Sequence, residues 1–180
     1  MRLFVAIELN DAVRALAAQA ASALREAGVP GRYEFPEKLH VTTAFLGSVP
    51  DDQLQAVLET FRSSGQHKPF WIDFDRLGAF PNARRPHTIW IGSTQESSGF
   101  TSCAQTVRAG FERLGFRFES KATPHVTICR VKHVTALTLP ELANCARLQV
   151  DGLTLFQSLP AGPTTRYEAI DRTHFGKSPY

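Results

Sequence analysis

The tetrapeptide His40-Val41-Thr42-Thr43 has a near copy later in the chain, His125-Val126-Thr127-Ile128. Each copy lies in a run of β-branched and apolar residues, 39–46 and 125–131, and such runs predict strands rather than helices. Because alternate side chains of a strand point to the same side, roughly 6–7 Å apart, each histidine shares a face with the threonine two positions later. Residues two apart on a helix do not face each other. The chain must therefore build two strands that each display a histidine and a threonine.

A single His-x-Thr carries little information, since both residue types are tolerated on half-buried strands. The flanking residues of the two copies also match, however, because each copy follows a predicted helix end, a glycine and an aromatic segment. The matching residues are Arg25-Glu26-Ala27-Gly28, Tyr33 and Phe35 before the first copy, and Glu112-Arg113-Leu114-Gly115, Phe116 and Phe118 before the second. This repeated order predicts an internal duplication and a pseudo-twofold pair of lobes.

Two such strands facing each other across a cleft supply two imidazoles and two hydroxyls, a set that suits a phosphate ester. Hydrolysis of a phosphate ester needs a base that activates water and an acid that protonates the departing oxygen. A histidine with an ordinary pKa near 6.5 can serve as either near neutral pH. The hydroxyls of Thr42 and Thr127 can donate hydrogen bonds to the non-bridging oxygens. Because the two motifs are nearly symmetric, they leave open which of His40 and His125 is the acid.

The paired motifs resemble those of the 2H phosphoesterases, in particular the bacterial and archaeal RNA 2′,3′-cyclic phosphodiesterases, which are also called 2′-5′ RNA ligases. The similarity extends over nearly the whole chain. It includes residues 2–7, Ala44-Phe45-Leu46-Gly47, residues 85–92, Thr123-Pro124 before the second motif, Arg130 after it, and residues 158–167. Thr43 departs from the family, which usually has leucine there, and Val41 and Val126 replace other aliphatic residues. These three side chains are expected to point away from the cleft, with no loss of chemistry.

The resemblance implies hydrolysis of RNA 2′,3′-cyclic phosphate ends to 2′-phosphate ends, with reversible 2′-5′ RNA ligation at the same site. It assigns His40 as the proton donor to the leaving 3′ oxygen and His125 as the proton acceptor from water. Arg130 is expected to bind the phosphate together with Thr42 and Thr127. The expected partner is RNA with a 2′,3′-cyclic phosphate end, for example a tRNA fragment, and no cofactor or metal is expected.

The predicted fold class is α+β, with two lobes related by a pseudo-twofold duplication and two antiparallel sheets with outer helices around a central cleft. The chain of 180 residues, 43% of them hydrophobic, is expected to form one domain over 1–180. Strands are predicted over 1–9, 33–35, 39–46, 70–77, 88–92, 116–119, 125–131, 150–158 and 167–170, and helices over 11–27, 51–63, 97–115 and 140–144.

Several other classes of protein lack support in the sequence. It contains no His-Glu-x-x-His, paired Cys-x-x-Cys, Gly-x-Ser-x-Gly or Walker-type loop, as a metalloenzyme, a serine hydrolase or a P-loop enzyme would require. No segment reaches the roughly 20 apolar residues of a membrane span, and no signal peptide is evident. The three cysteines, an odd number without metal-binding spacing, fit reduced thiols. We therefore expect a cytoplasmic protein without membrane association, and a monomer.

The net charge of +3 is too small to indicate a nucleic-acid partner by itself. The placement of basic residues near the expected cleft is more informative, and these are Arg84, Arg85, His87, Arg130, Lys132 and His133. The histidines outside the motifs have no threonine partner and are expected on the surface or in loops; they are His67, His87, His133 and His174.

Three functions remain open from the sequence. An RNA-end phosphodiesterase is favoured over an enzyme of the same fold that acts on a small nucleotide such as ADP-ribose cyclic phosphate, because the charged loops around Arg84 and Arg85 favour a polymer. A catalytically idle RNA-binding module is disfavoured, because a pure binder has no need of two histidines.

Overall fold

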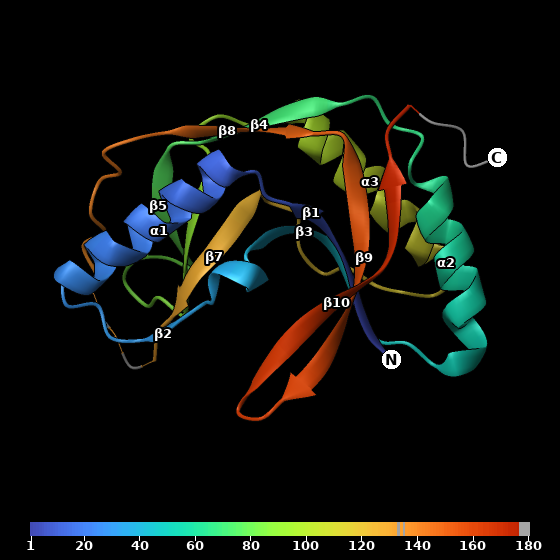
Figure 1. Cartoon of the computed structure of the whole chain (residues 1–180), viewed down its shortest axis with the longest axis horizontal. Coiled ribbons are helices and arrows are strands. Elements are labelled where there is room, and N and C mark those ends of the chain that lie inside the picture. The colour runs from blue at the N-terminus through green and yellow to red at the C-terminus, as the bar shows by residue number, and fades with distance from the viewer. Residues whose placement is uncertain (133, 135, 177–180) are drawn as a thin grey trace.

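The structure is a computed structural model that describes residues 1–132, 134 and 136–176. Within these residues, helices α1, α2 and α3 and strands β1 to β10 follow one another (Figure 1). Their order is β1 (Arg2–Glu8), α1 (Asp11–Glu26), β2 (Arg32–Tyr33), the 3-10 turn η1 (Pro36–Lys38), β3 (His40–Ser48), the 3-10 turn η2 (Asp51–Gln53), α2 (Leu54–Ser63), β4 (Phe70–Phe74), β5 (Arg76–Phe80), β6 (Thr88–Gly92), α3 (Ser98–Glu112), β7 (His125–Arg130), β8 (Ala146–Val150), β9 (Gly152–Ala161) and β10 (Thr164–His174). Among these residues, no helix is long and apolar enough to cross a membrane.

The predicted α+β fold with two antiparallel sheets is confirmed. The larger sheet has eight strands in the order β10-β9-β1-β3-β7-β6-β5, with β2 also paired to β7, and the smaller sheet pairs β4 with β8. The larger sheet carries strands of both halves of the chain. Its two halves meet between β3 and β7, where Val41 opposite Val126 is the one pair in register. The β9–β10 hairpin extends away from the body of the molecule (Figure 1).

Helix α1 begins at the predicted residue and ends one residue early, α3 ends three residues before the predicted 115, and the first three residues of the helix predicted over 51–63 form η2 instead. The Asn10 side chain caps α1 by accepting a hydrogen bond from the Val13 amide at 3.0 Å, and Ser97 caps α3 in the same way. Helix α1 contacts β7 and α3 contacts β3, so each helix packs against the motif strand of the other half. The two halves are thereby interleaved around one core, in which Val41 and Val126 are fully buried.

Four predicted elements were wrong. The strand predicted over 70–77 is two strands in different sheets, β4 and β5, and the break falls at Asp75, whose amide donates to the Gly92 carbonyl and whose carboxylate accepts from Thr94. Residues 116–119 form no strand, because this segment folds back on α3, with the Phe116 amide donating to the Phe111 carbonyl. Residues 140–144 form no helix. The strand predicted over 150–158 is divided at residue 151 between β8 and β9.

The Thr43 hydroxyl is buried and donates a hydrogen bond to the Val5 carbonyl at 3.1 Å, which links β3 to β1 on the side away from the cleft. Replacing Thr43 with valine keeps the shape and removes this bond, which costs about 0.5–1.5 kcal/mol of unfolding free energy. A loss of about 1 kcal/mol lowers Tm by roughly 2–4 °C in a chain of this size. Urea and thermal unfolding measure the change.

The same substitution at the next residue, Thr42→Val, is the matched control. The Thr42 hydroxyl bonds to the His40 ring rather than to the backbone, and it is half-buried. We therefore expect a smaller loss of stability in Thr42→Val than in Thr43→Val, and equal losses would contradict this reading of the Thr43 bond.

Candidate active site

The Val41–Val126 pair fixes which side chains of the two motifs meet. Both valines point into the core, so the residues on either side of each valine point to the opposite face. In an antiparallel pair, the residue before one valine lies across from the residue after the other. His40 therefore lies across from Thr127, and Thr42 lies across from His125. An undistorted ladder separates such diagonal neighbours as His40 and His125 by roughly 7–8 Å.

Each motif histidine is held by the same kind of backbone contact. His40 Nδ1 lies 2.6 Å from the carbonyl oxygen of Lys38, and His125 Nδ1 lies 2.8 Å from that of Thr123. A carbonyl oxygen only accepts, so Nδ1 carries the hydrogen and donates it in both cases. This leaves Nε2 of each ring for the cavity. In His40, Nε2 also lies 3.0 Å from the Thr42 hydroxyl.

Aromatic rings pack against both imidazoles. The His40 ring lies against Phe4 and Tyr167, with centroid separations of 4.9 and 5.4 Å. The His125 ring lies against Phe80 and Trp90, at 4.9 and 6.2 Å. These packed surroundings disfavour the charged imidazolium, while the bond to the backbone carbonyl favours it. Burial has the larger effect and lowers the pKa of both histidines, and the neighbouring His125 lowers the pKa of His40 further.

The position of the Trp90 ring depends on glycine. The ring crosses Gly78 on the neighbouring strand, and a Cβ atom at Gly78 would lie 2.2 Å from it. No side chain fits in that space. The absence of a side chain at Gly78 therefore allows the Trp90 ring to lie beside the His125 ring and cover one side of it.

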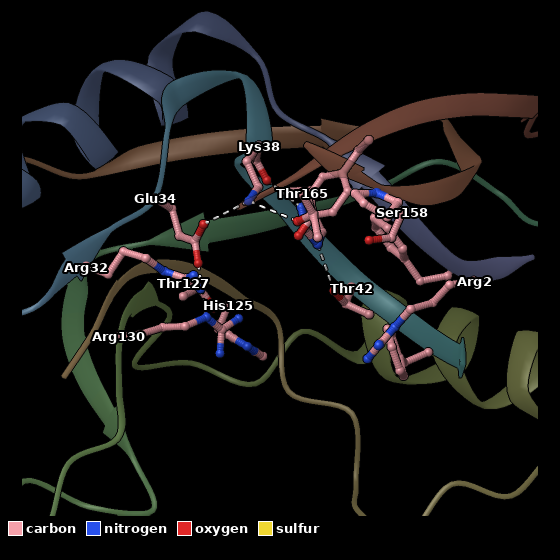
Figure 2. Close-up of a pocket in the computed structure, with 15 residues that line it drawn as sticks. Arg2, Arg32, Glu34, Lys38, Thr42, His125, Thr127, Arg130, Ser158 and Thr165 are labelled. Atoms are coloured by element: carbon pink, nitrogen blue, oxygen red, sulfur yellow. Dashed lines mark hydrogen bonds and ion pairs between the residues drawn. The ribbon is translucent and has the colours of Figure 1, made fainter. Parts of the chain in front are cut away.

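Two cavities meet at the motif side chains Thr42, His125 and Thr127. The first, of about 710 Å³, extends toward the β9–β10 hairpin, and the second, of about 720 Å³, extends toward residues 117–123. Both are lined by Thr42, Phe45, His125, Thr127 and Arg130, while His40 lines the first. Figure 2 shows Arg130, His125 and Thr127 close together on one side of the first cavity, with Lys38 and Thr165 on the other.

The five residues selected from the sequence are thus brought together in the first cavity. The other basic residues expected near the cleft, Arg84, Arg85, His87 and Lys132, line neither cavity, and His133 lies outside the described residues. Of the remaining histidines, His87 and His174 are exposed as predicted, and His67 is half-buried in a loop.

Several residues of the first cavity were not predicted. They are Arg32, Glu34 and Lys38, together with Arg2 and Tyr167, which were noted only within longer stretches. Glu34 and Lys38 stand just before the first motif, and charged residues so close to a predicted site were the available signal. No cluster of three or more histidine, cysteine, aspartate or glutamate side chains suited to a metal occurs among the described residues.

Several proteins are similar to this chain over most of its length. An RNA 2′,3′-cyclic phosphodiesterase of Archaeoglobus fulgidus is 35% identical over 176 residues, covering 91% of this chain and 95% of the relative. The Escherichia coli RNA 2′,3′-cyclic phosphodiesterase is 29% identical over 174 residues, with 95% and 94% covered. The crystal structure of Escherichia coli LigT complexed with 3′-AMP superposes with a TM-score of 0.80 at 27% identity and covers 98% of each chain.

The family model described as LigT like phosphoesterase matches the chain twice, over residues 7–90 and 91–167. Each match contains one His-x-Thr motif, in agreement with the predicted internal duplication. Together the two matches span most of the sequence, and the chain belongs to the LigT-like phosphoesterase family.

Proposed function

We propose that this protein hydrolyses RNA 2′,3′-cyclic phosphate ends to 2′-phosphate ends, with His40 as the acid and His125 as the base. The observation that carries the proposal is the pair of histidines from two duplicated halves, each fixed through Nδ1 and each presenting Nε2 to one cavity. Relatives named RNA 2′,3′-cyclic phosphodiesterase support the choice of substrate.

The proposed reaction is one in-line displacement. Nε2 of neutral His125 takes a proton from water as the water oxygen attacks phosphorus. Nε2 of protonated His40 gives its proton to O3′ as the bond between phosphorus and O3′ breaks, which leaves the phosphate on O2′. The hydroxyls of Thr42 and Thr127 and the guanidinium of Arg130 donate to the non-bridging oxygens, where charge develops. The two histidines then return to their starting states by exchanging protons with solvent.

The second cavity, which His125 lines and His40 does not, also bears on ligation. At about 720 Å³ it is far larger than a water molecule, so it has room for a hydroxyl carried by a second RNA end. Attack by such a hydroxyl would form a 2′-5′ linkage by the same proton transfers. Because residues of both halves line one cavity, we propose that residues 1–180 act as one unit and as a monomer.

A small cyclic nucleotide is the second candidate substrate, since the first cavity, at about 710 Å³, can hold a single nucleotide. Arg2 and Arg32 lie in the same cavity and favour a polymer with further phosphates. Comparison of kcat/KM for a short RNA and for a mononucleotide, both with cyclic phosphate ends, decides between them.

The assay of the proposed function uses a short RNA with a 2′,3′-cyclic phosphate end in excess EDTA. We expect hydrolysis at an unchanged rate, because two imidazoles suffice for both proton transfers, and a product with a 2′-phosphate. Chromatography against 2′- and 3′-phosphate standards identifies the product. A rate abolished by EDTA and restored by a divalent ion would contradict the metal-free mechanism, and a 3′-phosphate would reverse the assignment of the leaving oxygen.

Removing either histidine tests whether the two act on one displacement. We expect His40→Ala and His125→Ala each to lower kcat by roughly 10²–10⁴-fold with little change in Tm. The double variant should be little slower than the slower single variant, because the concerted path is already lost when one proton-transfer group is missing. His87→Ala removes an exposed histidine outside both cavities and is the matched control. Full turnover by a folded His40→Ala or His125→Ala protein would end the proposal.

The pH dependence of kcat/KM follows from the lowered pKa of both histidines. It reports groups of the free enzyme, and His40 must be protonated while His125 must be neutral. Burial lowers both pKa values below 6.5, so we expect a bell-shaped profile whose alkaline limb falls below pH 6.5. Because the unfolded chain then binds more protons than the folded one, stability should decrease as pH falls through 6.5. An alkaline limb well above pH 6.5 would contradict the effect of burial.

A further inference from the structure

A carboxylate with little exposure to solvent lies inside the cavity that is proposed to bind phosphate. The Glu34 side chain is only 11% exposed, and its Oε1 accepts a hydrogen bond from Arg130 Nε at 3.0 Å. Its Oε2 lies 3.6 Å from Lys38 Nζ. Figure 2 shows Glu34 between these two basic side chains. A negative charge here repels an anionic substrate unless basic groups offset it.

Lys38 does not offer its hydrogens to a substrate. Its side chain is 8% exposed, and Nζ donates to the hydroxyls of Thr164 and Thr165 at 3.2 Å each, besides its ion pair with Glu34. These three partners use the three donors of an ammonium group. Nζ also lies 5.1 Å from the centre of the Tyr167 ring. Lys38 therefore offsets the charge of Glu34 and ties it to the end of the β9–β10 hairpin.

Arg130 has the opposite arrangement. Its side chain is 50% exposed, and Glu34 holds it through Nε alone. Within the described part of the chain, the terminal amino groups Nη1 and Nη2 have no protein partner. A guanidinium is planar and rigid, so fixing Nε also fixes the direction of both terminal groups. Arg130 lines both cavities beside His125 and Thr127, where those groups can meet two oxygens of one phosphate.

We propose that Glu34 is a positioning residue that holds the Arg130 guanidinium toward the phosphate, and that Lys38 keeps Glu34 in place. This inference rests on the proposed function, in which Arg130 binds the reacting phosphate. Without Glu34, the long arginine side chain is free to take other rotamers, and the same hydrogen bonds form less often in the transition state. Glu34 thus acts through Arg130 and touches no substrate atom itself.

The test compares Glu34→Ala and Glu34→Gln, each in the wild-type and in the Arg130→Ala background, with the cyclic phosphate RNA as substrate. Misplacement of Arg130 should lower kcat of Glu34→Ala by roughly 10- to 100-fold. Glu34→Gln keeps an oxygen that can accept from Nε and should stay within about 3-fold of wild type. In the Arg130→Ala background, Glu34→Ala should cause no further loss, because the residue that it positions is gone.

Asp73→Ala is the matched control, because it also removes a carboxylate paired with an arginine Nε, that of Arg147, but on the exposed surface outside both cavities. It should leave kcat and KM unchanged. A loss from Glu34→Ala that is equally large in the Arg130→Ala background would overturn the inference, and so would a loss that Glu34→Gln does not rescue. Full turnover by Arg130→Ala would remove both this inference and the phosphate role of Arg130. The histidine variants test the two-histidine mechanism independently of either result.

Discussion

The contact between Val41 and Val126 is the constraint on which the arrangement of the site depends. Both side chains are fully buried, and they form the one pair in register between the two motif strands. Because side chains alternate along a strand, burying the valines forces the histidine and threonine of each motif to the other face. A shift of either strand by one residue would bury the imidazoles and expose the valines. The hydrophobic core thus sets the register that presents the polar groups.

Two opposing influences determine the protonation of the motif histidines. Aromatic neighbours such as Phe4 and Phe80 bury the rings and lower the pKa of each, while the backbone carbonyl at Nδ1 stabilises the charged form. Burial has the larger effect, so each ring favours the neutral form more than a free imidazole does, and the hydrogen of that form is on Nδ1. Such rings are ready to accept a proton at Nε2, and an anionic phosphate in the cavity would raise their pKa again. This combination suits a pair that must hold one proton between them.

Local sequence patterns predicted the elements whose stability is local. The apolar run of β1 and the Asn10 cap of α1 could be seen without tertiary information, as could the duplication that the family model also shows. The incorrect strand predictions over 70–77 and 116–119 have a common cause, which is hydrogen bonding to residues outside the predicted segment. Residues 70–77 alternate like one strand, but hydrogen bonds of Asp75 to a distant strand divide them between two sheets. Residues 116–119 have strand-forming side chains but pack against the helix before them.

The sequence by itself determined that each motif strand displays a histidine and a threonine on one face, since that follows from the two-residue period of any strand. Only the tertiary structure decided that His40 lies across from Thr127, because this depends on which strands pair and in which register. It also decided the surroundings of the pair. Glu34 and Lys38 reach the cavity from the segment before β3, and Tyr167 reaches it from β10, so the contact between Lys38 and Tyr167 joins parts far apart in the chain. Burial, and with it the lowered pKa of both histidines, arises only when those segments assemble.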